Sequence, residues 1–262
     1  MVWLPCRAGY ELMTGVRKLL GVGARTAGPV EFLNWGSAGA GNGGSAGVDV
    51  SSWGIQSGDT ILIMWAVAYL YPVYAGGIGF DTALEDGGTN RTPLFTEVTR
   101  YDGIDSAAYF EGAQGAYVYF CDDVLPTSYV YIRTGQGQTA LTAHVAHFRN
   151  ATSCTLVGNT SGDGASDPVA YTQATGLQLS DHIVSVFSKA SRTQATVTGP
   201  TNSDANTPVT GASGGSPSPQ YDSRSVMSRK AIAGNHTFQF TGATTAAGGS
   251  SESWSTTTVR LR

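Results

Sequence analysis

Apolar residues along this chain gather in short runs separated by turn residues, and one run is much stronger than the others. It is the continuous apolar segment Thr60-Ile-Leu-Ile-Met-Trp-Ala-Val-Ala-Tyr-Leu-Tyr71. The turn cluster Ser57-Gly-Asp59 comes directly before it. A continuous apolar run of this length predicts a central strand that is buried on both faces.

The other strand signals are shorter runs of β-branched and aromatic residues, without a helical pattern between them. Those expected strands cover residues 30–33, 93–101, 116–121, 128–133, 139–148, 169–172, 182–188, 195–198, 225–232, 237–240 and 253–262. The glycine-rich stretch 36–47 and the polar stretch 199–221 are expected to be loops. No internal repeat is visible in the sequence. The pattern predicts an all-β fold, an antiparallel two-sheet sandwich of jelly-roll type.

Residues 1–28 differ from the rest because they are basic and carry leucines at helix-like spacing, while their glycines weaken any helix. A frayed terminus and an anchor peptide that orders against another subunit both fit. The domain prediction is an N-terminal attachment segment, 1–28, followed by a β-sandwich domain, 29–262; two smaller domains also fit this length. The predicted attachment residues are Trp3, Arg7, Tyr10, Leu12, Arg17, Lys18, Leu19 and Leu20.

Composition narrows the function classes. Charged residues make up 13% of the chain and the net charge is −4, so the clustered cations that nucleic-acid binding requires are absent. The longest apolar run is about half of the roughly 20 residues that span a bilayer, and the first residues do not match a secretory signal. We therefore expect no nucleic-acid partner, no membrane insertion and no standard secretion.

The residues that could carry chemistry form no known catalytic or metal-binding motif. Cys6, Cys121 and Cys154 are too widely spaced for a metal site, and we expect buried free thiols, with one Cys121–Cys154 disulfide left open. His144 and His147 lie three apart in one strand and should point to opposite faces. We predict no cofactor and no enzymatic activity.

The acidic residues cluster in predicted turns, where Asp normally caps its own backbone. The candidates for a loop calcium site are Asp81, Glu85 and Asp86, or Asp102 and Asp105, although no EF-hand spacing is present.

Tyrosines give a stronger signal for binding. Tyr117 and Tyr119 should share one face of a strand, and so should Tyr129 and Tyr131. Cross-strand aromatic packing is one interpretation. The alternative is a platform on which a sugar ring could stack, with neighbouring polar groups bonding its hydroxyls.

The order of these segments along the chain resembles that of a known class of proteins. The Ser57-Gly-Asp59 turn precedes a long apolar strand; aromatic strands follow near Tyr117–Phe120 and Tyr129–Ile132, then an alanine-rich strand ending at His147-Phe-Arg149. This order, continued by the later strand 182–188, resembles β-sandwich structural proteins of tailed bacteriophages and gene-transfer agents.

The resemblance covers approximately residues 48–262 and implies a virion component of the tail, baseplate, fibre or capsid, assembled in the host cytoplasm. It carries over no catalytic residues. The implied partners are other virion proteins, copies of itself and, as a further partner, a host-surface glycan. The alternative functions are a carbohydrate-binding module and, less favoured, a glycan-active enzyme.

Overall fold

A computed structural model describes the strands of this chain and the short turns between several of them. The described residues are 28–41, 45–70, 80–86, 89–90, 95–106, 110–120, 129–134, 139–163, 169–191, 196–213, 221–231, 235–243 and 253–262. This part of the chain contains seventeen strands and no helix. The predicted all-β class is therefore confirmed.

The strands form four sheets, and the paired strands of the described residues are all antiparallel. The first five-stranded sheet has the order β1 (Glu31–Gly41), β9 (Thr139–Arg149), β3 (Asp59–Leu70), β7 (Phe110–Phe120), β6 (Thr96–Ser106). The second has the order β10 (Cys154–Asp163), β17 (Ser253–Leu261), β12 (His182–Ser191), β15 (Tyr221–Ala231), β14 (Ala205–Ser213).

Two smaller sheets complete the structure. The four-stranded sheet has the order β2 (Ser45–Asp49), β8 (Tyr129–Thr134), β4 (Phe80–Asp86), β5 (Thr89–Asn90). The three-stranded sheet has the order β11 (Val169–Ala174), β16 (His236–Ala243), β13 (Thr196–Thr198).

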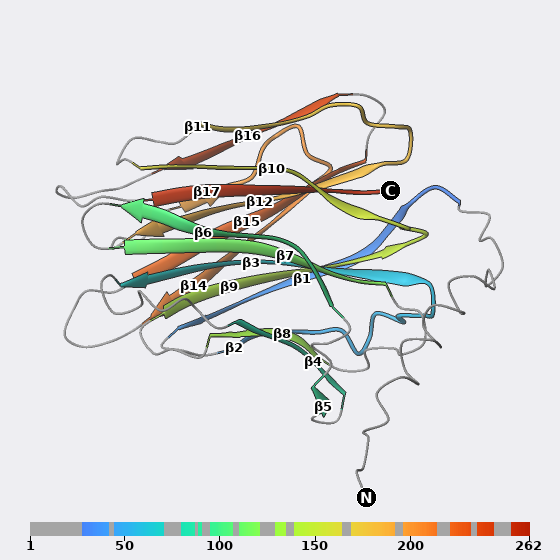
Figure 1. Cartoon of the computed structure of the whole chain (residues 1–262), viewed down its shortest axis with the longest axis horizontal. Coiled ribbons are helices and arrows are strands. Elements are labelled where there is room, and N and C mark those ends of the chain that lie inside the picture. The colour runs from blue at the N-terminus through green and yellow to red at the C-terminus, as the bar shows by residue number, and fades with distance from the viewer. Residues whose placement is uncertain are drawn as a thin grey trace, which may run out of the picture.

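The four sheets stack as layers, with the two five-stranded sheets in the middle (Figure 1). Two facing antiparallel sheets were predicted and are present; the two outer sheets were not predicted. They are needed because both middle sheets bear apolar side chains on both faces, and each face must be covered. Three separate clusters of buried side chains fill the spaces between the layers.

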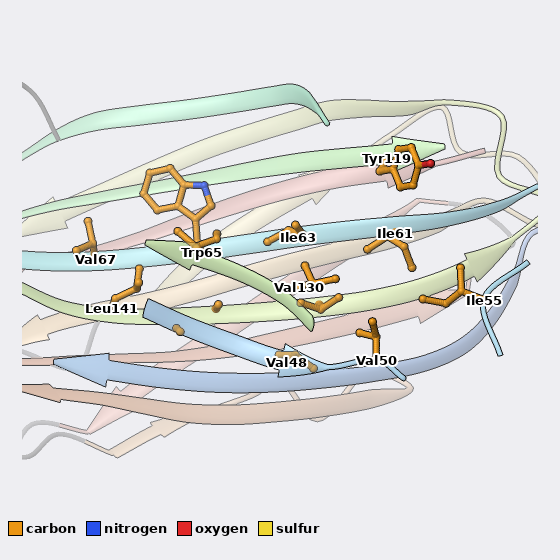
Figure 2. Close-up of a cluster of buried hydrophobic side chains, with 14 residues drawn as sticks. Val48, Val50, Ile55, Ile61, Ile63, Trp65, Val67, Tyr119, Val130 and Leu141 are labelled. Atoms are coloured by element: carbon orange, nitrogen blue, oxygen red, sulfur yellow. The ribbon is translucent and has the colours of Figure 1, made fainter. Parts of the chain in front are cut away.

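The first outer core lies between the four-stranded sheet and the first five-stranded sheet. Figure 2 shows Ile61, Ile63, Trp65 and Val67 of β3 on this side. The alternate residues of β3 face the other way, so this strand is buried on both sides, as its continuous apolar sequence predicts. This first outer core also includes Val48 of β2, Val50 directly after β2, and Val130 and Ile132 of β8.

The middle core joins the two five-stranded sheets. Leu62, Met64 and Phe148 come from the first sheet, and Val186 and Met227 come from the second. The second outer core lies between the second five-stranded sheet and the three-stranded sheet. It is built from Ile183, Phe187, Val197, Val226, Phe238 and Phe240.

Two predicted loops contain strands instead. The glycine-rich stretch 36–47 continues β1 to Gly41 and begins β2, and the polar stretch 199–221 contains β14. β1 and β14 are outer strands of their sheets, so their ladder partners β9 and β15 stabilise sequences with little strand propensity of their own.

The strand order of the first half, residues 29–150, recurs in the second half, residues 151–262. The order β1-β9-β3-β7-β6 corresponds strand by strand to β10-β17-β12-β15-β14. The order β2-β8-β4 corresponds in the same way to β11-β16-β13. The structure therefore contains a repeat that the strand sequences do not show, because the strand residues of the two halves differ.

Candidate functional site

The predicted site residues fall partly outside the part of the chain that the structure describes. Trp3, Arg7, Tyr10, Leu12, Arg17, Lys18, Leu19 and Leu20 all lie outside it, so the attachment segment stays a prediction. The backbone of Asp81, Glu85 and Asp86 lies in β4, but their side chains are outside the description, as are those of Asp102 and Asp105 in β6. No group of three or more His, Cys, Asp or Glu among the described residues could hold a metal ion.

The tyrosine pair of β7 shares one face, as predicted. Tyr119 is 5% exposed and packs in the first outer core, with its ring 5.6 Å from that of Phe95. A buried ring offers no face on which a sugar can stack, so Tyr119 fits the packing interpretation. Tyr117 is half-buried, and its hydroxyl donates to the Glu97 carboxylate at 3.2 Å. The side chains of Tyr129 and Tyr131 lie outside the description.

His144 and His147 point to opposite faces of β9, as predicted. His144 Nε2 lies 2.7 Å from Ser225 Oγ of β15, between the two middle sheets. His147 Nε2 lies 2.8 Å from Asp59 Oδ2 on the other face, and its ring stacks on Trp53 at a centroid distance of 6.2 Å. Both side chains are fully buried.

Asp59 is the centre of a buried charged group in the first half. This first clamp consists of Asp59, His147 and Arg149, where Arg149 Nε donates to Asp59 Oδ1 at 3.0 Å. The Gln56 amide donates to Asp59 Oδ2 at 2.8 Å, and the Asp59 amide donates back to the Gln56 carbonyl at 3.0 Å. Burial alone would raise the pKa of Asp59, but these hydrogen bonds hold that pKa below its usual value.

The second half contains a corresponding pair, the second clamp, Asp181 and Arg262. Arg262 Nε donates to Asp181 Oδ1 at 2.8 Å and its Nη2 donates to Oδ2 at 2.7 Å, a bidentate geometry. The Gln178 amide donates to Asp181 Oδ2 at 2.9 Å. Burial would again raise the carboxyl pKa, and the bonds from Arg262 and Gln178 again lower it.

Neither clamp was predicted from the sequence, although a local signal exists. Gly54-Ile-Gln-Ser-Gly-Asp59 and Gly176-Leu-Gln-Leu-Ser-Asp181 share glycine, glutamine and aspartate at the same spacing. Gly54 and Gly176 have φ of 62° and 66°, and Gly58 and Ser180 have φ of 94° and 77°. The two turns therefore have left-handed residues at the same two positions, and in each the aspartate amide donates to the backbone carbonyl of the glutamine three residues before it.

A polar layer lies beside the middle core and connects the two halves. Gln114 of β7 accepts a hydrogen bond from Thr257 Oγ1 at 2.9 Å and donates to Ser188 Oγ and to the Ser255 carbonyl. Opposite it, Ser225 Oγ donates to Thr142 Oγ1 at 2.8 Å beside His144. These side chains are fully or almost fully buried, and their bonds hold the two sheets together.

Burial also sets the chemistry of two further groups. It lowers the pKa of His144 to about 3, so the ring is neutral near neutral pH. Cys154 is a free thiol, and burial raises its pKa to about 12, which makes it a poor nucleophile. His144 is therefore part of the packed interior, and Cys154 is partly buried against the middle core.

In the described part of the chain, no helix has the length and apolar character that crossing a membrane would require. No protein-family model matches this chain, and no curated protein matches its sequence.

Proposed function

We propose that this protein is a non-enzymatic structural component of a bacteriophage virion. In this proposal the N-terminal segment, 1–28, docks onto a neighbouring virion protein. The β-sheet body, a sandwich of jelly-roll type, is displayed outward on the tail, baseplate, fibre or capsid, where it contacts the host surface. The implied partners are other virion proteins and copies of the same chain, and no cofactor is involved.

The observation that carries the proposal is that the buried titratable side chains bond to other residues of the body. The buried histidine His147 holds Asp59, and His144 bonds to Ser225 across the two middle sheets. The aspartates of both clamps are engaged by arginines at strand ends. Groups with these partners stabilise strands, which supports a structural role for the body.

The layered construction also supports display. Each middle sheet is covered on both faces, and three cores lie between the four layers. A body whose strands are covered in this way opens rarely and resists proteases, which suits an exposed particle component.

The test is incorporation into particles. Virions made with the intact gene should contain the chain when purified particles are analysed by mass spectrometry. Deletion of residues 1–28 should leave a body that folds, shown by circular dichroism and cooperative thermal unfolding, but that is missing from the particles. Particles that lack the intact chain would overturn the virion role; particles that retain the deleted chain would overturn the anchor alone.

One observation favours a second candidate, a carbohydrate-binding module. Tyr117 is half-buried, and its hydroxyl contacts the exposed carboxylate of Glu97, so an aromatic face and an acceptor lie together. This candidate predicts glycan binding that Tyr117→Ala reduces at least tenfold, while Tyr117→Phe retains most of it. A glycan array without signal at high protein concentration would exclude glycan binding as the primary function.

A further inference from the structure

One row of paired residues across the large sheet of the first half corresponds to one row across that of the second half. In the first half, one row across the sheet reads Ser37, His144, Met64, Ala116, Thr99. In the second half, the corresponding row reads Asn159, Thr257, Val186, Met227, Thr207. The rows are matched because Met64 and Val186 each lie five residues after the clamp aspartate of their own half.

The contacts between the halves join these rows in opposite directions. Ser37, which begins the first row, lies 3.2 Å from Thr207, which ends the second row, measured between hydroxyl oxygens. Asn159, which begins the second row, donates to Thr99, which ends the first row, also at 3.2 Å. Reversed contacts of this kind are what a twofold axis between two copies produces.

The interior of the interface follows the same relation. Thr257 bonds to Gln114, and His144 bonds to Ser225. These two pairs correspond, because Thr257 and His144 occupy the same place in their rows. Gln114 lies two residues before Ala116 of β7, and Ser225 lies two residues before Met227 of β15. The middle core likewise contains both members of corresponding positions, Met64 with Val186 and Ala116 with Met227. The polar and apolar parts of the interface are therefore both self-complementary.

The main chain passes between the halves through a short connection. β9 ends at Arg149 and β10 begins at Cys154, which leaves residues 150–153 as the link. Asn150 has a φ of 63°, the left-handed conformation that often marks a sharp change of direction. A self-complementary interface joined by a short link is the arrangement from which two chains can exchange equivalent parts.

We propose that the face between the two five-stranded sheets is a dimerisation surface whose partner is a second copy of this chain, reached by exchange of halves. In the exchanged dimer, the first half of one chain packs on the second half of the other, with the same contacts. Because those contacts are unchanged, the link between the halves determines the equilibrium between the monomer and the exchanged dimer. It holds the halves at an effective concentration on the order of 1 mM, so exchange should become appreciable at comparable protein concentrations.

The test uses the full chain with one cysteine in each half, Ser37→Cys with Thr207→Cys. The protein is unfolded, refolded at roughly 1 μM and at roughly 1 mM, separated by size exclusion and then cross-linked through the new thiols. Monomers should give an intrachain link. Refolding at high concentration should give a dimer whose two chains stay covalently joined on a denaturing non-reducing gel.

Two matched variants keep the result decisive. Thr99→Cys with Asn159→Cys probes the corresponding contact and should behave in the same way, so the test does not depend on one pair folding well. Ala38→Cys with Ala143→Cys joins β1 to β9 within one half and should link within a chain in every species. The parent chain, with its native cysteines, gives the background.

Two results would contradict the exchange of halves. Absence of a dimer at every refolding concentration would overturn the proposal. So would a dimer in which the 37–207 and 99–159 links stay within one chain, because that dimer would use another surface.

Discussion

At the scale of single residues, buried charges hold this protein together where its central strands begin. Asp59 is the first residue of β3, and Asp181 comes directly before β12. Each aspartate bonds to the turn in front of its strand and to an arginine at the end of the neighbouring strand. Each aspartate is almost fully buried, whereas its arginine is about one third exposed. The carboxylate is therefore the member whose loss should matter more.

Replacing that carboxylate tests this directly. Asp59→Asn should lower the free energy of unfolding by about 2 kcal/mol at pH 7, because the charged bonds to Arg149 and His147 are lost. The folded-state pKa of Asp59 lies below its unfolded value. Its contribution is therefore present above the unfolded pKa and disappears as pH falls through the folded pKa.

Urea unfolding at pH 7 and near pH 3 measures both effects. Asp181→Asn, at the corresponding position, should give a loss of similar size, and Asp49→Asn, at the exposed end of β2, should change little. An Asp59→Asn variant as stable as the parent at pH 7 would show that the clamp does not stabilise the fold.

His144 makes a separate pH prediction. Its folded-state pKa of about 3 lies below the unfolded value of 6.5, so the unfolded chain binds the proton first as pH falls. The contribution of His144 to the free energy of unfolding should decrease as the pH falls below 6.5, by up to about 1.4 kcal/mol per pH unit, until the folded-state pKa is reached.

The comparison that isolates this effect is His144→Gln, which keeps a polar side chain near Ser225 but cannot titrate. Between pH 6.5 and pH 4 the parent should lose more stability than the variant, as measured by chemical denaturation across that range. Parallel curves for the two proteins would contradict a buried neutral ring.

At the scale of elements, the pairing of β3 with β7 depends on a close approach. Trp65 of β3 lies opposite Gly115 of β7, and a Cβ on residue 115 would come within 2.5 Å of the indole ring. Trp65 is fully buried in the first outer core, so the ring has little room to move. The glycine is therefore required by packing.

Gly115→Ala should lower the free energy of unfolding by about 1–3 kcal/mol through overpacking. Gly158→Ala is the matched control, because it also lies in a strand and its added Cβ meets no atom within 4 Å. Thermal and denaturant unfolding of both variants gives the difference. Equal stability of the two variants would show that the indole moves aside freely.

At the scale of the whole molecule, the middle core couples the two halves. Val186 and Met227 of the second half pack with Leu62, Met64 and Phe148 of the first. A side chain lost from this core removes contacts from both halves, whereas one lost from an outer core affects its own half.

Met227→Ala and Phe240→Ala test that coupling, because both residues belong to the second half and both are fully buried. Each should cost about 2–5 kcal/mol. Hydrogen exchange should show faster opening of β3 and β9 in Met227→Ala, and an effect concentrated in β12, β15 and β16 in Phe240→Ala. Protection of β3 and β9 that is unchanged in Met227→Ala would mean that the halves open independently.

The sequence by itself determined the β-class, the central strand β3 and the opposite directions of His144 and His147. These features follow from local chemistry, because a continuous apolar run and a period of two are properties of one segment. Ser57-Gly-Asp59 was also readable as a turn, since glycine and aspartate favour that conformation.

Only the tertiary structure decided the four layers, the strands β2 and β14, and the repeat of one strand order in two halves. Edge strands with weak propensity are stabilised by neighbours that are distant in sequence. Many residue combinations can fill the same sheet positions, as Ser37 and Asn159 do, or His144 and Thr257. The two halves therefore keep their topology and their clamp turns while their strand sequences differ, and the pairing of those halves appears only where the rows meet.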